Sequence, residues 1–96
     1  MNPKPYLSLG EAIEAFLDKH GLRDEARIQQ LITEWETVIG KPIAEQTARL
    51  WFDRGVLHIH MRSPAWRQEL LLARTRIADV VNRYLKTPLV TEVQIH

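Results

Sequence analysis

A short stretch in the second half of the chain concentrates side chains that can bind a ligand. Trp51 stands among two arginines and two histidines, and the whole set is Arg49, Trp51, His58, His60 and Arg62. An indole among basic and imidazole groups can stack on a nucleic-acid base while the arginines neutralise phosphates. The same set also fits a protein contact or a homodimer interface, where an exposed tryptophan is favoured, or a solvated cross-strand pair.

The two histidines raise the question of a metal. His58 and His60 are two residues apart, so on a strand both side chains point the same way. Two imidazoles can begin a zinc site, whose further ligand would be His96 or a carboxylate such as Asp53 or Glu92. The usual His-x-x-x-His spacing is missing, and the chain has no cysteine. We therefore predict neither a metal site nor a cofactor.

Catalytic signatures are missing as well. Ser8 and Ser63 occupy positions typical of helix caps and lie in no nucleophile motif. The sequence has no phosphate-binding loop and no dinucleotide fingerprint. The zero cysteine count excludes a thiol nucleophile and a disulfide framework. We predict that the chain is not an enzyme.

A second group of cations lies in the longest predicted helix. Arg67 and Arg74 are seven residues apart, so they would share one face of a continuous helix, with Arg76 nearly a turn aside. This face fits a phosphate track or an acidic partner. It equally fits a solvated helix with local pairs such as Asp79 with Arg83. Arg67 and Arg74 are therefore secondary candidates for contact.

The net charge of +1 hides an asymmetry along the chain. Residues 1–46 carry five basic and eight acidic side chains, whereas residues 47–96 carry eight basic, seven of them arginine, and four acidic. Arginine suits phosphate and carboxylate recognition better than lysine does. An acidic N-terminal half and a basic C-terminal half are compatible with binding of nucleic acid, binding of an acidic partner, or ion pairing within the domain.

Length and composition limit the class of protein. A chain of 96 residues that is 45% hydrophobic and 26% charged is typical of one small globular domain. We expect residues 1–96 to form that domain, with residues 1–7 as a flexible N-terminus. The longest apolar run, residues 70–73, is too short to span a membrane. The N-terminus lacks the apolar core of a signal peptide, so we expect a cytoplasmic protein.

Residues typical of helix starts and ends predict the helices that must help to position these side chains. Ser8 and Glu11 have the spacing of a capping box, and an apolar stripe follows until Gly21. The stripe comprises Leu9, Ile13, Phe16 and Leu17. A second helix from near Asp24 to Gly40 would complete a helical hairpin, with one irregular turn over residues 42–46.

A third helix has the clearest start and end. Ser63 would cap it, Pro64 would take its first position, and the pattern continues to Leu85 or Lys86. Its buried stripe comprises Trp66, Leu70, Ala73, Ile77, Val81 and Tyr84. Such a helix would have about 22 residues and span roughly 33 Å.

Two alternating runs, residues 47–53 and 56–62, predict a β-hairpin around Arg54-Gly55. One register keeps every apolar side chain on one face: Phe52 with Leu57, Leu50 with Ile59 and Ala48 with Met61. This register requires an even-length loop of two or four residues. It also places Trp51 opposite His58 and Arg49 opposite His60, on the other face.

A last strand over residues 90–95 would direct Thr91, Val93 and Ile95 inward. The order α-α-β-β-α-β then predicts an α+β fold. Its mixed three-stranded sheet would carry the helices on one face, which leaves the other face open.

Residues spread along the whole chain carry a family resemblance. They are Trp35-x-x-Val38-x-Gly40, Ile43, Thr47, Gly55-x-Leu57, Ser63-Pro64-x-Trp66-x-x-Glu69-Leu70 and Asn82. This ordered combination resembles the DciA family, formerly a bacterial domain of unknown function, from about Leu9 to Ile95. Trp35 and Trp66 also lie on apolar helix stripes, which predicts core packing for both.

The resemblance implies a KH-like fold and a non-catalytic role in bacterial chromosome replication. DciA-type proteins interact with the replicative helicase and help to place it on DNA, so the implied partners are that helicase and single-stranded or duplex DNA. The alternative is a protein-interaction or homodimerisation module that uses the open sheet face without binding nucleic acid.

Two departures from the family pattern matter. KH domains clamp a nucleic-acid backbone with a Gly-x-x-Gly loop. The four glycines of this chain, Gly10, Gly21, Gly40 and Gly55, do not provide that spacing. Longer family members carry an extended basic tail, whereas this sequence ends at His96, directly after the last predicted strand. We therefore expect a short form without the tail.

Overall fold

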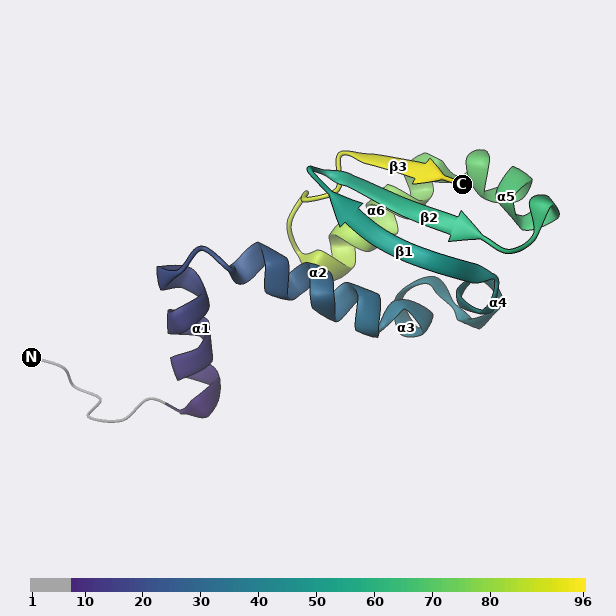
Figure 1. Ribbon diagram of the computed structural model, residues 1–96. Coiled ribbons are helices and arrows are strands. Elements are labelled where there is room, and N and C mark those ends of the chain that lie inside the picture. The colour runs from purple at the N-terminus through teal and green to yellow at the C-terminus, as the bar shows by residue number, and fades with distance from the viewer. Residues whose placement is uncertain (1–7) are drawn as a thin grey trace, which may run out of the picture.

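The computed structural model describes residues 8–96, so the expected flexibility of residues 1–7 lies outside the described residues. The elements are α1 (Leu9–Lys19), α2 (Arg23–Thr33), α3 (Trp35–Ile39), α4 (Lys41–Glu45), β1 (Thr47–Asp53), β2 (Val56–Met61), α5 (Pro64–Leu71), α6 (Arg74–Leu85) and β3 (Glu92–Ile95). Figure 1 shows the sheet with α6 and the α2–α3 segment on one side of it. This arrangement confirms the α+β prediction and is consistent with a KH-like fold.

The sheet has the strand order β1-β2-β3, with β2 antiparallel to β1 and parallel to β3. The pairs Phe52–Leu57 and Leu50–Ile59 confirm the predicted register. The two turn residues, Arg54 and Gly55, have φ values of 48° and 86°, as the tight hairpin requires. A Cβ on Gly55 would also lie 2.8 Å from Thr91 Oγ1, so the turn and the approach to β3 both require glycine.

The predicted pair Ala48–Met61 is wrong because β1 bulges at its start. Thr47 pairs with Met61 instead, and Ala48 is exposed. The bulge turns the Thr47 hydroxyl inward, where it accepts a hydrogen bond from Trp35 Nε1 at 3.1 Å. The same hydroxyl donates to the Ile43 carbonyl at 2.8 Å. Hydrogen bonds of the Thr47 hydroxyl, which join α3, α4 and β1, thus take the place of the predicted contact of the Ala48 methyl group.

Both long predicted helices are interrupted. The second divides at Glu34 into α2 and α3, and the third divides at residues 72–73 into α5 and α6. The predicted Ser63 cap is confirmed, since its hydroxyl accepts from the Trp66 amide at 3.4 Å. The irregular turn expected after Gly40 is the short helix α4. Neither interruption contains a proline or glycine, so tertiary packing outweighs local helix propensity there.

The first helix forms as expected but does not pack as expected. Its capping box is present, with Ser8 Oγ accepting from the Glu11 amide at 3.1 Å. No residue of α1 is buried, and Figure 1 shows α1 standing away from the sheet. The predicted helical hairpin is therefore wrong, because the apolar stripe of α1 does not lie against α2.

The last strand is shorter than expected and begins at Glu92. Val93 is buried and Ile95 is half-buried, whereas Thr91 is exposed and donates to the Gly55 carbonyl at 3.2 Å. The prediction that Thr91 points into the core is therefore wrong. Asn82 fixes the connection before β3: its amide donates to the Val90 carbonyl at 2.8 Å and accepts from the Val90 amide at 2.9 Å.

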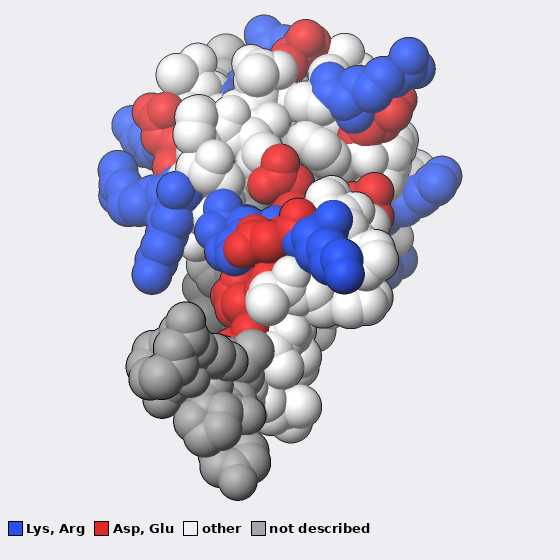
Figure 2. All heavy atoms as spheres, turned by 90° about the vertical axis from the view of Figure 1, so that its left-hand side faces the viewer, with Lys and Arg blue, Asp and Glu red and all other residues white. Residues whose placement is uncertain are grey.

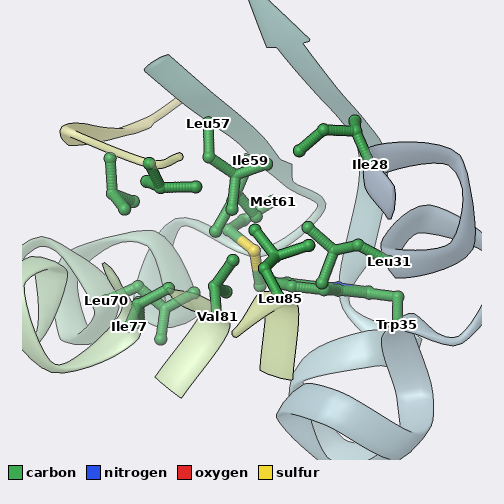
Figure 3. Packing of buried hydrophobic residues seen from close by; sticks show 12 residues of the cluster. Ile28, Leu31, Trp35, Leu57, Ile59, Met61, Leu70, Ile77, Val81 and Leu85 are labelled. Atoms are coloured by element: carbon green, nitrogen blue, oxygen red, sulfur yellow. The ribbon is translucent and has the colours of Figure 1, made fainter. Parts of the chain in front are cut away.

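The core lies between the helices and the covered face of the sheet. Figure 3 shows side chains from β2, from α2 and α3, and from α5 and α6 pointing toward one another. Leu31, Leu57, Ile59 and Val81 are fully buried at its centre. Trp35 is 6% exposed, which confirms its predicted place in the core, and the half-buried Trp66 packs against the same cluster. None of the helices within residues 8–96 is both long and apolar enough to cross a bilayer.

Candidate functional site

The face of the sheet opposite the core carries the side chains that the sequence singled out. Alternation along β1 and β2 sends Arg49, Trp51, His58 and His60 to this face, because their neighbours Leu50, Leu57 and Ile59 face the core. The register pairs Trp51 with His58 and Arg49 with His60, as predicted. We call this surface the open face.

Trp51 is the centre of an aromatic stack on the open face. Its ring lies 4.8 Å from that of His58, with an angle of 1° between the planes. His96 lies 5.3 Å from the same indole at 15°. The Arg49 guanidinium carbon is 4.4 Å from the indole centroid, within the range of a cation–π contact. We call Arg49, Trp51, His58 and His96 the stacked cluster.

A hydrogen bond joins the two imidazoles of the stacked cluster. His58 Nδ1 and His96 Nε2 are 2.9 Å apart. One ring nitrogen must donate and the other accept, so at least one of the two rings is neutral while this bond exists. From the sequence, His96 is a candidate only for metal ligation. Its place in the stack depends on the parallel register of β3, which strand alternation alone does not set.

The other candidates form a second, adjacent group. His60, Arg62, Arg67 and His96 line a small hollow of about 120 Å³ at the start of α5, together with Met61, Ser63 and Pro64. We call it the basic hollow. His96 belongs to both groups, so the stacked cluster and the basic hollow are contiguous.

Arg74 does not join this group. The prediction that Arg67 and Arg74 share a helix face is wrong, because the chain breaks between α5 and α6. Arg74 instead donates to the Leu71 carbonyl at 3.1 Å and borders a different hollow with Asp79 and Glu92.

The ion pairs of residues 8–96 lie around α1 and the start of α2, within α4 and at the hairpin turn. Seen from the α1 side, acidic and basic side chains lie next to one another (Figure 2). Arg23 contacts Asp18 at 2.5 Å and Glu14 at 2.7 Å, and its hydrogen bond holds the pKa of the Asp18 carboxyl below its usual value. Arg54 pairs with its neighbour Asp53. Arg49, Arg62 and Arg67, by contrast, form no ion pair within the described part of the chain.

The remaining candidate residues have structural roles or do not form the predicted site. Pro64 starts α5, and Gly40 ends α3 with a φ of 96°. Of the residues considered for zinc, His58 and His96 lie together but hydrogen-bond each other. Across residues 8–96, no three His, Asp or Glu side chains are grouped in a way that could hold a metal ion.

Comparison with known proteins identifies the family. The model of the family described as "Dna[CI] antecedent, DciA" matches residues 8–95. The curated "UPF0232 protein BL0636" of Bifidobacterium longum (strain NCC 2705) is 32% identical over 69 residues, which are 72% of this chain. The match spans 44% of that relative's own length. No solved structure matches the chain. On the extent of the family match, this chain belongs to the DciA family.

Proposed function

We propose that this domain is a non-catalytic binding module of bacterial chromosome replication that contacts single-stranded DNA through its open face and interacts with the replicative helicase. The helicase role comes from membership of the DciA family. The observation that carries the DNA role is the stacked cluster beside unpaired arginines. This arrangement offers planar groups for bases and cations for phosphates on one surface.

We propose different tasks for the members of the cluster, according to their exposure and contacts. Trp51 and His58 are half-buried, whereas Arg49 and His96 are exposed. The indole is already in contact with two imidazoles and a guanidinium, so its first task is to hold these planar groups in place. A base would stack on the exposed His96 ring or on the Arg49 guanidinium, both of which are planar surfaces that bases use in protein complexes.

Titration of a fluorescent single-stranded oligonucleotide at several salt concentrations tests the DNA role. We expect binding at low salt that weakens linearly on a logarithmic salt scale. Trp51→Ala should lower the affinity about tenfold, because the His96 ring and the Arg49 guanidinium lose the indole that holds them, and base stacking on such groups contributes roughly 1–3 kcal/mol. Trp51→Phe, which keeps a ring against the imidazoles, should lose less.

Arg54→Gln is the matched control, because Arg54 is an arginine of the same hairpin that already has a carboxylate partner. It should change the affinity little. If the wild-type domain binds no single-stranded DNA at low salt, the DNA role is wrong. If Trp51→Ala and Arg54→Gln have equal effects, the DNA site lies elsewhere.

The same variants test the helicase role in a pull-down with purified replicative helicase. Capture of the helicase by the wild-type domain supports the role, and no capture contradicts it. Retention of helicase by a domain that has lost DNA binding through Trp51→Ala would assign the two partners to separate surfaces. Loss of both by this one change would assign the two partners to the same open face. Helicase capture by a wild-type domain that binds no DNA, with capture lost in Trp51→Ala, would favour the alternative, in which the open face is a protein-interaction surface without nucleic-acid binding.

A further inference from the structure

We propose that the basic hollow is a binding site for a single phosphate group of a nucleic-acid strand. The inference rests on the proposed DNA role and gives it a specific anchor. Three segments meet at the hollow. His60 lies near the end of β2 and Arg62 directly follows it, Arg67 lies in the first turns of α5, and His96 directly follows β3.

Backbone hydrogen bonds fix this meeting point. The Met61 amide donates to the His96 carbonyl at 2.9 Å, and the His96 amide donates to the Ile59 carbonyl at 2.8 Å. The Arg67 amide donates to the Ser63 carbonyl at 3.0 Å. The side chains around the hollow therefore project from ordered backbone on all three segments, which lowers the entropy lost when a ligand binds.

The charges around the hollow favour an anion. Its lining has two arginines and two imidazoles and no Asp or Glu side chain. Neither arginine has an ion-pair partner between residues 8 and 96. Because Arg62 and Arg67 line the same hollow, a bound anion would offset the repulsion between their positive charges. Guanidinium groups also present paired N–H donors that match the oxygens of a phosphate.

The size of the hollow limits the ligand. The hollow has a volume of only about 120 Å³. Sites for larger organic ligands typically have roughly 300–1,000 Å³. The start of α5 adds few donors of its own, because Pro64 has no N–H and Ser63 Oγ accepts that of Trp66. The side chains must therefore provide the recognition.

The position of the hollow relates this phosphate to the proposed base site. His96 stacks on Trp51 and also lines the hollow. A strand whose base rests on the stacked cluster can thus place a neighbouring phosphate among Arg62, Arg67 and His60. The phosphate is either an internal diester of the strand or a terminal monoester, and both share the tetrahedral oxygens that the arginines recognise.

Oligonucleotide titration with arginine variants tests the hollow. We expect Arg67→Gln and Arg62→Gln each to lower affinity for single-stranded DNA about tenfold and to reduce the salt slope by about one. Arg54→Gln serves again as the control for loss of one positive charge. If the wild-type chain binds DNA and all three variants behave alike, the phosphate site is wrong while the DNA role stands.

A second measurement separates the two ideas and the two sources of phosphate. Inorganic phosphate added to the wild-type domain should shift the backbone resonances of residues 60–67 and 96 in NMR spectra, and Arg67→Gln should abolish the shifts. Shifts without any DNA binding would support the site and contradict the DNA role, whereas their absence with both phosphate and DNA overturns the site. Tighter binding of a 5′-phosphorylated oligonucleotide than of its 5′-hydroxyl counterpart would identify the terminal monoester as the source, and equal binding would identify the internal diester.

Discussion

Helices α1 and α6 are amphipathic elements of nearly equal length that differ in what covers their apolar sides. They have 11 and 12 residues, respectively. Ile77, Val81 and Leu85 of α6 are at most 4% exposed in the core. On α1, Leu9 is 79% exposed and Phe16 56%. An amphipathic pattern creates an apolar stripe, but stabilisation comes from the surface that buries it.

The polar contacts of the two helices strengthen this contrast. The hydroxyl of Tyr84 on α6 donates to the Glu34 carboxylate at the end of α2, so a hydrogen bond adds to the buried apolar contacts. α1 is tied to α2 by the ion pairs of Arg23 with Glu14 and Asp18, all at the surface. We therefore expect α6 to unfold only with the whole domain and α1 to open by itself.

The largest expected difference comes from matched leucine truncations. Leu85→Ala removes a side chain that is 3% exposed and should lower the free energy of unfolding by about 2–5 kcal/mol. Leu9→Ala, at 79% exposure, should change it by less than about 0.5 kcal/mol. Urea unfolding followed by circular dichroism measures both. Equal losses of stability in the two variants would show that α1 packs against the domain in solution, and would contradict the contrast between α1 and α6.

The second prediction concerns the bond between α6 and α2. Tyr84→Phe should lower the free energy of unfolding by about 1 kcal/mol at neutral pH, the usual net contribution of one hydrogen bond. The bond to the Glu34 carboxylate also raises the pKa of Tyr84 to about 12. Because the folded state holds this proton more tightly, the contribution is complete below about pH 10 and is lost as the pH rises toward 12.

Tyrosinate absorbance checks this titration. The other tyrosine is Tyr6, and a Tyr6→Phe background leaves Tyr84 as the single reporter. Glu34→Gln should return its pKa toward the ordinary value, since the neighbouring negative charge is gone. An unchanged titration in that variant would contradict the link between α6 and α2.

Much of the fold could be predicted because local signals and packing agreed. The hairpin register held at Leu50 and Phe52 because a slip of one residue would expose a whole apolar face. The caps at Ser8 and Ser63 held because each satisfies amides that the helix cannot. These features are decided within a few residues of the chain, so the pattern alone contains them.

The wrong predictions concern features that depend on contacts between segments distant in the sequence. The helix breaks after Leu71, although the residues there are good helix formers. The bulge at Thr47 allows a hydrogen bond with Trp35, which lies 12 residues away in the sequence. The stripe of α1 was visible, but its lack of a partner was not. In the candidate site, pairing of Trp51 with His58 was predictable from the hairpin. The arrival of His96 depends on β3, which pairs with β2 only after the α5–α6 crossover.

A smaller effect is expected at the ends of the two helices. α6 ends at Leu85 and is followed by Lys86, whose φ of 60° is a left-handed conformation that is unfavourable for a residue with a side chain. The end of α1 is followed by Gly21, with a φ of 68°. Lys86→Gly should therefore stabilise the domain by about 0.5–1 kcal/mol in urea unfolding. Gly21→Ala, whose Cβ would meet open space, strains only the end of α1 and should leave the unfolding midpoint unchanged. A midpoint shift there would contradict the independence of α1.

The smallest effect on global stability should come from removing the ion pairs that join α1 to α2. Arg23→Gln removes the ion pairs with Glu14 and Asp18, so we expect faster hydrogen exchange at the α1 amides and an unchanged urea midpoint. The hydrogen bond from Arg23 lowers the pKa of Asp18, so this ion pair is complete at neutral pH and is lost as the pH falls through the acid range. High salt should weaken these ion pairs as well, because Arg23 is partly accessible to solvent and both carboxylates are exposed. If Arg23→Gln instead lowered the midpoint as Leu85→Ala does, the surface contacts of α1 would be part of the cooperative core, and its uncovered apolar stripe would need a different explanation.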